Sequence, residues 1–229
     1  MMKEHKLVKE GVDMQVELKN IHYKTRKNFE LKDISFNIEQ GFITGLIGKN
    51  GAGKTTIFQM LMNQNSKYTG EILIDGTDIK NPKADRGKIG LISEEQKFIG
   101  NKSMLDNAVL CGLLCDEFSI DTFKSLMNEM KLSYAKHVES SSRGEKMKFQ
   151  LALALSRNLE LLLIDEATAG MDPVFRKDFF KILHQYMEDE KHSILISTHN
   201  EEEVKRHMDY VVELKEGRAY VRNGILKDM

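Results

Sequence analysis

The segment GKNGAGKTT at residues 48–56 fits the pattern G-x-x-x-x-G-K-[ST] and directly follows the apolar run FITGLI at residues 42–47. A buried strand that enters a glycine-rich turn and then a helix gathers backbone N–H groups and the positive end of the helix around one anionic site. A glycine-rich turn can also match this pattern by chance, but the flanking strand and helix patterns argue against that alternative. The segment therefore predicts a phosphate-binding loop.

Within this segment the side chains have separate expected roles. Lys54 is expected to reach the β- and γ-phosphates of a bound nucleotide, and the Thr55 hydroxyl is expected to hold Mg²⁺. The residues predicted to surround the phosphates are Gly48, Asn50, Gly51, Gly53, Lys54, Thr55 and Thr56.

Length, composition and charge limit the remaining alternatives. With 229 residues, of which 41% are apolar, the chain can build one domain with a sizeable core. The 35 acidic and 34 basic residues nearly cancel, so no strong field attracts nucleic acid or anionic lipid. The charged start has no apolar core behind it, and the longest apolar run, residues 108–115, is far below the ~20 residues of a spanning helix. A cytoplasmic protein without a leader or a membrane span is therefore expected.

The two cysteines lie one helical turn apart in that apolar run. Cys111 and Cys115 are predicted to pack as small core residues. A two-ligand metal site is the alternative, but no second Cys/His pair at zinc spacing accompanies them. Such sparse use of cysteine is typical of a reducing compartment.

Hydrophobic periodicity divides the chain into segments of different kinds. Alternation at residues 14–18 and 31–38 predicts antiparallel strands ahead of the buried strand, and helical spacing from about 104 to 132 predicts a helical lobe. Further strands are predicted at residues 71–76, 88–92, 161–164, 193–197 and 210–214, and helices after Thr55, at 144–157, after Pro173 and after Ser197. The predicted fold class is α/β, a P-loop NTPase core with a mostly parallel sheet, an N-terminal antiparallel β lobe and an inserted α-helical lobe.

A pair of carboxylates stands at the end of another apolar strand. Residues 161–164 read LLLI and lead directly into Asp165 and Glu166. Because ligands of an open α/β sheet bind beyond the carboxyl ends of its strands, both side chains can face the phosphate loop. Asp165 is expected to orient Mg²⁺, directly or through its water, and Glu166 to polarise the water that attacks the γ-phosphate. The alternative is an acidic cap on a following helix.

Between these two motifs lies a serine-rich turn. The sequence SSSRGEKM at residues 140–147 opens an amphipathic helix. Here the chain resembles the ATP-binding-cassette (ABC) family of ATPases, whose L-S-G-G-Q signature falls on SSRGE at residues 141–145 and matches at Ser142 and Gly144. Ser142 and Glu145 also form an S-x-x-E capping box, which is compatible with an anion site at the same helix N-terminus.

The resemblance covers residues from about 14 to 217 and implies further site residues. It implies that ATP binds with Mg²⁺ between two nucleotide-binding subunits arranged head to tail, with Ser142 and Gly144 of one subunit closing on the γ-phosphate held by the other. It also implies a cross-interface role for Asp172 and a γ-phosphate contact for the switch histidine, His199. The alternatives are a helix N-cap role for Asp172 and a structural role for the histidine.

Three positions of the resemblance are less regular. Tyr23 is placed like the family aromatic residue that stacks on adenine, although tyrosine is also common in strands. The family glutamine falls on Glu94, which would bind Mg²⁺ and contact a partner, while Gln96 lies two residues further on. Ala167 replaces the proline that usually follows the glutamate.

Taken together, the resemblance implies a transport ATPase. The expected protein is a single domain over residues 1–229, with the catalytic core and β lobe at about 14–93 and 144–217 and the helical lobe at about 94–143. It is expected to form a homodimer or heterodimer at the inner face of the cell membrane, docked through its helical lobe to a separate integral membrane subunit, with export favoured over import. A soluble ABC-family switch acting on a ribosome or on DNA is the rival, and an ATP-dependent binding module without turnover is a third alternative.

Overall fold

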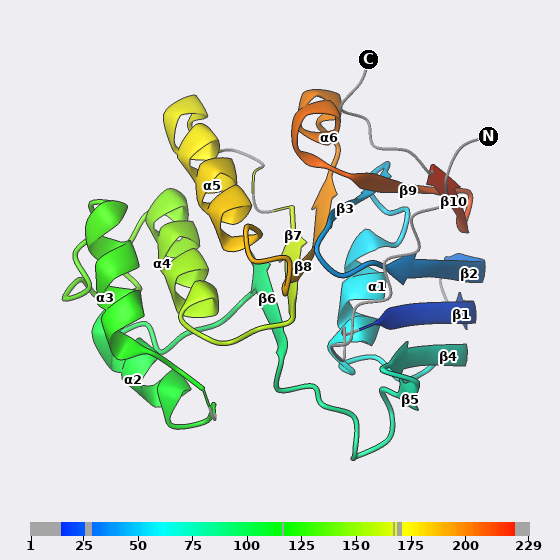
Figure 1. The fold of residues 1–229 in the computed structure, drawn as a ribbon, viewed down its shortest axis with the longest axis horizontal. Helices are drawn as coiled ribbons and strands as arrows, with labels where there is room; N and C mark the ends of the chain where they lie inside the picture. Colours follow the sequence, from blue (N-terminus) through cyan, green and yellow to red (C-terminus); the bar gives the residue numbers. More distant parts are fainter. Residues whose placement is uncertain (1–14, 26–28, 116, 167, 169–170, 223–229) are drawn as a thin grey trace.

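The computed structural model describes residues 15–25, 29–115, 117–166, 168 and 171–222. This part of the chain forms two β-sheets and six helices (Figure 1). The antiparallel sheet lies to one side of the molecule, the mostly parallel sheet lies in the middle, and α2, α3 and α4 lie on the far side. This arrangement confirms the predicted α/β class with its antiparallel lobe and its mostly parallel sheet.

The antiparallel sheet is built from the N-terminal half of the chain. Its strands follow the order β2-β1-β4-β5, with bounds β1 Val16–Lys24, β2 Glu30–Ile38, β4 Thr69–Ile74 and β5 Thr77–Asp78. Every second or third side chain of β2 is buried, from Leu31 and Ile34 to Phe36 and Ile38. One face of the sheet is therefore apolar, as the alternation in the sequence predicts. The predicted start of the first strand at Met14 lies outside the described residues.

The second sheet carries the predicted core strands. Its order is β10-β9-β3-β8-β7-β6, with bounds β3 Ile43–Gly48, β6 Ile89–Ser93, β7 Leu161–Asp165, β8 Ser193–Thr198, β9 Tyr210–Lys215 and β10 Arg218–Arg222. The pairs from β9 to β6 are parallel, and only β10 runs antiparallel to its neighbour. The parallel strands β3, β7 and β8 therefore end at the same edge of the sheet.

Strand β7 shows why these segments are apolar throughout. Leu161 and Leu163 belong to a core shared with α1 and the antiparallel sheet, whereas Leu162 and Ile164 belong to a second core shared with α4 and α5. A strand that is buried on both faces needs apolar side chains at every position. The sheet is thus held rigidly on both sides, and its carboxyl edge is a firm base for a site.

Six helices complete the described fold. Their bounds are α1 Lys54–Leu61, α2 Met104–Gly112, α3 Ile120–Glu129, α4 Arg143–Leu155, α5 Pro173–Tyr186 and α6 Glu201–His207. The ring of Phe149 on α4 contacts Phe123 on α3, while Gln150 on the same helix accepts a hydrogen bond from the backbone N–H of Ser93 on β6. Because α4 packs on both a helix and the sheet, a lobe boundary near residue 143 stays a prediction.

The apolar run at residues 108–115 is placed differently from the expectation of a packed core. Ala108 is buried, but Leu113 and Leu114 are 78% and 89% exposed. Cys111 is partly buried and packs against the core, as predicted, whereas Cys115 is partly buried without belonging to that core. Helix α2 lies at the surface, so only one of its faces can reach the core, and the rest of this apolar run is left facing outward.

Candidate nucleotide-binding and catalytic site

The predicted phosphate loop connects β3 to α1. Gly53 occupies the N-cap position of α1 with a φ of 111°, and no side chain caps the helix there. A Cβ atom at Gly53 would lie 2.7 Å from Leu31 Cδ2 and 2.8 Å from Phe29 Cζ. Only glycine fits this left-handed, crowded position. The first N–H groups of α1 are thereby left for an anion, as the motif predicts.

Lys54 is the most deeply buried cation of the loop. Its side chain is 3% exposed, and its Nζ donates a hydrogen bond of 2.9 Å to the Gly48 carbonyl. The same Nζ lies 3.1 Å from Glu166 Oε1. A buried ammonium is tolerated only with such polar partners. The structure therefore brings Lys54 and Glu166 together across more than a hundred residues of sequence.

The two predicted carboxylates are joined by a residue that the sequence motifs did not single out. Ser197, which is fully buried and pairs in register with Asp165, donates a hydrogen bond of 2.6 Å from Oγ to Asp165 Oδ1. The backbone N–H of Glu166 donates to the same Oγ at 2.8 Å. Glu166 has a φ of 48°, which is uncommon for a residue other than glycine. The only feature of the sequence that could have indicated this role of Ser197 was a hydroxyl near the end of a buried strand.

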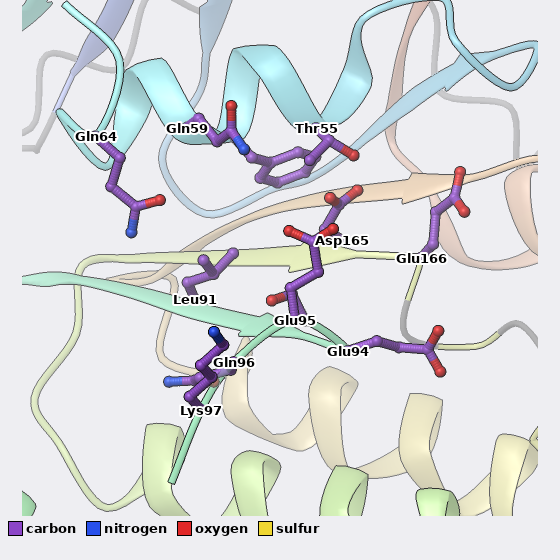
Figure 2. Close-up of a pocket in the computed structure, with 12 residues that line it drawn as sticks. Thr55, Gln59, Gln64, Leu91, Glu94, Glu95, Gln96, Lys97, Asp165 and Glu166 are labelled. Atoms are coloured by element: carbon purple, nitrogen blue, oxygen red, sulfur yellow. The ribbon is translucent and has the colours of Figure 1, made fainter.

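The acidic helix cap offered as an alternative for these carboxylates does not occur. Asp165 ends β7, and the next helix, α5, begins at Pro173 with Asp172 as its N-cap. Asp165 and Glu166 instead line a cavity of about 360 Å³ together with Thr55. In Figure 2, Thr55 on α1 lies opposite Asp165, and Glu94 and Gln96 enter from the segment after β6.

The cavity suits Mg²⁺ in the company of phosphates. The Thr55 hydroxyl and the Asp165 carboxylate are oxygen donors, which Mg²⁺ prefers. Across the described residues, no group of three or more His, Cys, Asp or Glu side chains is arranged to hold a metal ion. Mg²⁺ commonly takes one or two protein ligands and completes its coordination with phosphate oxygens and water. Thr55 and Asp165 fit that pattern.

Phe29, an aromatic residue that the sequence did not single out, lies at the loop next to the predicted Tyr23. Phe29 lines a pocket of about 280 Å³ with Gly51, Gly53, Lys54, Thr55, Thr56 and Glu166. Gly48 and Asn50 line a neighbouring pocket of about 660 Å³, again with Phe29. The ring of Tyr23 contacts that of Phe29 edge-on, with ring centroids 6.3 Å apart, and its stacking on adenine stays a prediction. The signal for Phe29 was an isolated aromatic residue just ahead of a strand, which is too common to be specific.

The serine-rich turn begins α4, as the capping box predicts. Ser142 Oγ accepts a hydrogen bond of 3.2 Å from the Glu145 N–H, and Glu145 Oε2 accepts one of 2.8 Å from the Ser142 N–H. A hydrogen bond from Lys136 and the bond from Ser142 hold the pKa of the Glu145 carboxyl below its usual value. Ser142 is exposed, and neither it nor Gly144 lines the phosphate-loop cavities of the described chain.

Glu94 contacts this turn rather than the loop. Its carboxylate forms an ion pair with the guanidinium of Arg143, the first residue of α4. Glu94 and Gln96 both line the cavity of Asp165 and also a groove of about 560 Å³ beside α4. The structure thus leaves both residues as candidates for the family glutamine position.

Asp172 and His199 lie at the start of the two following helices. Asp172 Oδ1 accepts a hydrogen bond of 2.9 Å from the Phe175 N–H, so the N-cap role is met. His199 follows the last residue of β8 and is exposed at the carboxyl edge of the sheet. Both residues are therefore accessible to a ligand or to another subunit, and their roles toward the nucleotide stay predictions.

The fold and the site are those of a P-loop nucleotide-binding protein, and comparison with known proteins gives its family. Residues 31–169 match the family model described as ABC transporter. The chain is 34% identical over 188 residues to the lipopolysaccharide export system ATP-binding protein LptB of Escherichia coli K12, covering 78% of this chain and 76% of LptB. It is 30% identical over 211 residues to the methionine import ATP-binding protein MetN of Protochlamydia amoebophila, covering 88% and 62%.

A solved structure described as an ATP-binding subunit of an ABC transporter superimposes with a TM-score of 0.79 at 25% identity, covering 91% of this chain and 89% of that one. The chain belongs to the ABC transporter family and is an ATP-binding subunit of that family. It spans from 46% to 76% of the length of such curated relatives.

Proposed function

We propose that this chain hydrolyses ATP and couples the reaction to substrate movement through a separate membrane subunit. The observation that carries the proposal is the meeting of the phosphate loop and the two carboxylates at one edge of the sheet. Thr55, Asp165 and Glu166 line one cavity, and Lys54 forms an ion pair with Glu166. A phosphate-binding loop beside two carboxylates is the arrangement that phosphoryl transfer to water requires.

Each residue has a defined task in that reaction. Lys54 would exchange its contact with Glu166 for the β- and γ-phosphates, which frees the Glu166 carboxylate to polarise the attacking water. Thr55 and Asp165 would hold Mg²⁺, with Glu94 of the same cavity as a further ligand. The bound ion would neutralise charge on the phosphates. His199 would contact the γ-phosphate from the end of β8. Tyr23 is proposed to stack on adenine, with Phe29 beside it.

We infer that two subunits are needed to complete each site. At the start of α4, Ser142 is exposed and Gly144 is half-buried, and neither lines the phosphate-loop pockets of its own chain. A head-to-tail dimer would bring them to the γ-phosphate held by the second subunit, which is the same chain or a related one, with Asp172 at the interface. The helix N-terminus and its capping hydroxyl suit an anion.

The helical side offers the surface for a membrane partner. Leu113 and Leu114 are almost fully exposed at the end of α2, and Val109 and Leu110 are exposed beside them. Exposed apolar side chains gathered in this way mark interaction sites. No helix within the described residues is long and apolar enough to cross a membrane. We propose that the partner holds the chain at the inner, cytoplasmic face of the cell membrane. We propose no nucleic acid as a partner.

Hydrolysis is tested by the variant Glu166→Gln. Its steady-state turnover of Mg-ATP should fall by roughly 10²–10⁴-fold, the range for a positioned acid–base group, while ATP binding is retained. Glu188→Gln, at an exposed residue in the turn that follows α5, is the matched control and should turn over like the wild type. Unchanged turnover in Glu166→Gln would remove Glu166 from the reaction.

The partner and the direction are tested separately. The double variant Leu113→Asp/Leu114→Asp should keep ATP hydrolysis but no longer co-purify with an integral membrane protein. We favour export, the direction named for LptB, over import, the direction named for MetN. ATP-driven accumulation of substrate inside inverted membrane vesicles would support export. Co-sedimentation with ribosomes instead of membranes would favour the switch function.

A further inference from the structure

Glu203 is a buried carboxylate outside the motifs of the nucleotide site. It lies on α6 and is 4% exposed. Taking a carboxylate out of water is unfavourable unless hydrogen bonds and a nearby cation compensate. Its partners therefore indicate what the fold uses it for.

The carboxylate joins the turns that follow two neighbouring strands. Glu203 Oε2 accepts a hydrogen bond of 2.9 Å from Thr168 Oγ1 and one of 2.6 Å from Thr198 Oγ1. Thr168 follows β7, two residues after Glu166, and Thr198 is the last residue of β8, directly before His199. Both hydroxyls are buried. One oxygen atom thus ties the segment of the proposed general base to that of the proposed switch histidine.

The other oxygen extends the connection to α5. Glu203 Oε1 accepts a hydrogen bond of 3.4 Å from Asn200 Nδ2 and lies 3.7 Å from Arg176 Nε. Arg176 Nη2 in turn donates a hydrogen bond of 3.1 Å to the carbonyl of Met171, the residue before Asp172. The network therefore reaches from the proposed subunit interface to the end of β8.

We propose that Glu203 is a positioning residue for hydrolysis. It fixes His199 relative to Glu166 and transmits the placement of the Asp172 segment to that histidine when two subunits close. This inference rests on the proposed ATPase function. None of the hydrogen bonds recorded for Glu203 reaches residues 48–56, so nucleotide binding is spared when Glu203 is changed.

The test is Glu203→Gln, with Glu202→Gln as the matched control. Glu202 is the exposed neighbour on the same helix, so it undergoes the same change of charge without the network. Glu203→Gln should lower kcat about tenfold, as expected when a hydrogen bond to a charged group is lost. The KM for ATP should stay within about twofold of the wild type, because the change acts after binding. Glu202→Gln should behave like the wild type.

A double variant separates positioning from general structural support. If Glu203 acts through His199, then Glu203→Gln should lower kcat by less than roughly twofold in a His199→Ala background, because coupled residues are not additive. The pair Thr198→Val and Thr198→Ser provides a second approach, since the two differ in whether the hydroxyl is present. Thr198→Val should share the defect of Glu203→Gln, and Thr198→Ser should largely restore kcat.

The outcomes divide clearly. A wild-type kcat in Glu203→Gln, or the same fractional loss with and without His199, would overturn the inference while leaving the ATPase intact. If Glu203→Gln fails to fold, equal kcat values for Thr198→Val and Thr198→Ser would overturn it. If the wild type does not hydrolyse ATP, or if its hydrolysis is unaffected by Glu166→Gln, the proposed function and the inference are both overturned.

Discussion

The phosphate-loop side and the signature-turn side of the molecule hold their charged groups in opposite ways. Lys54 is 3% exposed and is fixed by the Gly48 carbonyl and Glu166. Arg143 and Glu94, which form an ion pair beside the signature turn, are 51% and 45% exposed. Buried, hydrogen-bonded groups are fixed by the fold, whereas an exposed ion pair contributes little energy and can change partners.

This difference suits a protein that completes one half of its site alone and leaves the other half to a second subunit. The loop, the carboxylates and Ser197 are already organised within one chain. The turn at Ser142 has its helix capped but its outer face free for a ligand. Variants on the phosphate-loop side should therefore have large effects on ATP binding and kcat. Variants on the signature-turn side should have small effects on the free energy of unfolding, and these should change when nucleotide binds.

The largest effect on binding is expected at the buried side, from Lys54→Ala. The variant removes charge-assisted hydrogen bonds to the phosphates, worth about 1.5–3 kcal/mol, so ATP affinity should fall by roughly 10- to 150-fold. Titration with a fluorescent ATP analogue measures it, and Lys67→Ala, an exposed lysine outside the loop, is the control. Wild-type affinity in Lys54→Ala would contradict the phosphate-loop assignment.

The next effect concerns Ser197, through the pair Ser197→Val and Ser197→Thr. Both replacements add branching at Cβ, but only threonine keeps the hydroxyl that joins Asp165 to the Glu166 backbone. Ser197→Val should lower kcat by roughly tenfold, an effect of the size usual for losing a group that orients a metal ligand. It should also raise the Mg²⁺ concentration that gives half-maximal ATP hydrolysis. Ser197→Thr should retain more activity. Equal kcat and equal Mg²⁺ dependence in the two variants would exclude the positioning role of the hydroxyl.

The same contrast explains what could be predicted from the sequence. The phosphate loop and the apolar strands follow from local patterns, because glycine and two-sided burial restrict the residues directly. Glu203 could be predicted from local spacing only as a cap partner of Asn200. Its bond to Thr168 and the bond of Ser197 to Asp165 were not predicted, because strand order brings these partners together and no local spacing records that order. The place of Phe29 at the loop was not predicted because an isolated aromatic residue ahead of a strand is too common to be specific. The exposed end of α2 was not predicted because periodicity does not say which apolar face has a partner.

A smaller effect is expected at the helix cap of the exposed side, from Ser142→Ala. Loss of a serine N-cap lowers the free energy of unfolding by about 1 kcal/mol, and urea unfolding measures that change. Ser142→Asp keeps an acceptor for the Glu145 N–H and should unfold like the wild type. If both variants unfold at the same urea concentration, the cap makes no contribution to stability.

The smallest effect is expected from the ion pair of Glu94 and Arg143. The single variants Glu94→Gln and Arg143→Gln and the double variant form a cycle whose coupling energy in urea unfolding should be about 0.2–1 kcal/mol, the range for an exposed pair. Salt at about 1 M should suppress it.

Binding of nucleotide should also remove the coupling energy between Glu94 and Arg143. In a Glu166→Gln background with saturating Mg-ATP, Arg143 would face the phosphates bound by the second subunit, and Glu94 would turn toward the cavity that it shares with Asp165. The two residues would then no longer share an interaction, so their effects on stability should become additive. A coupling energy that is the same with and without Mg-ATP would mean that Glu94 and Arg143 form a fixed surface contact. The signature-turn side would then be no more adjustable than the phosphate-loop side.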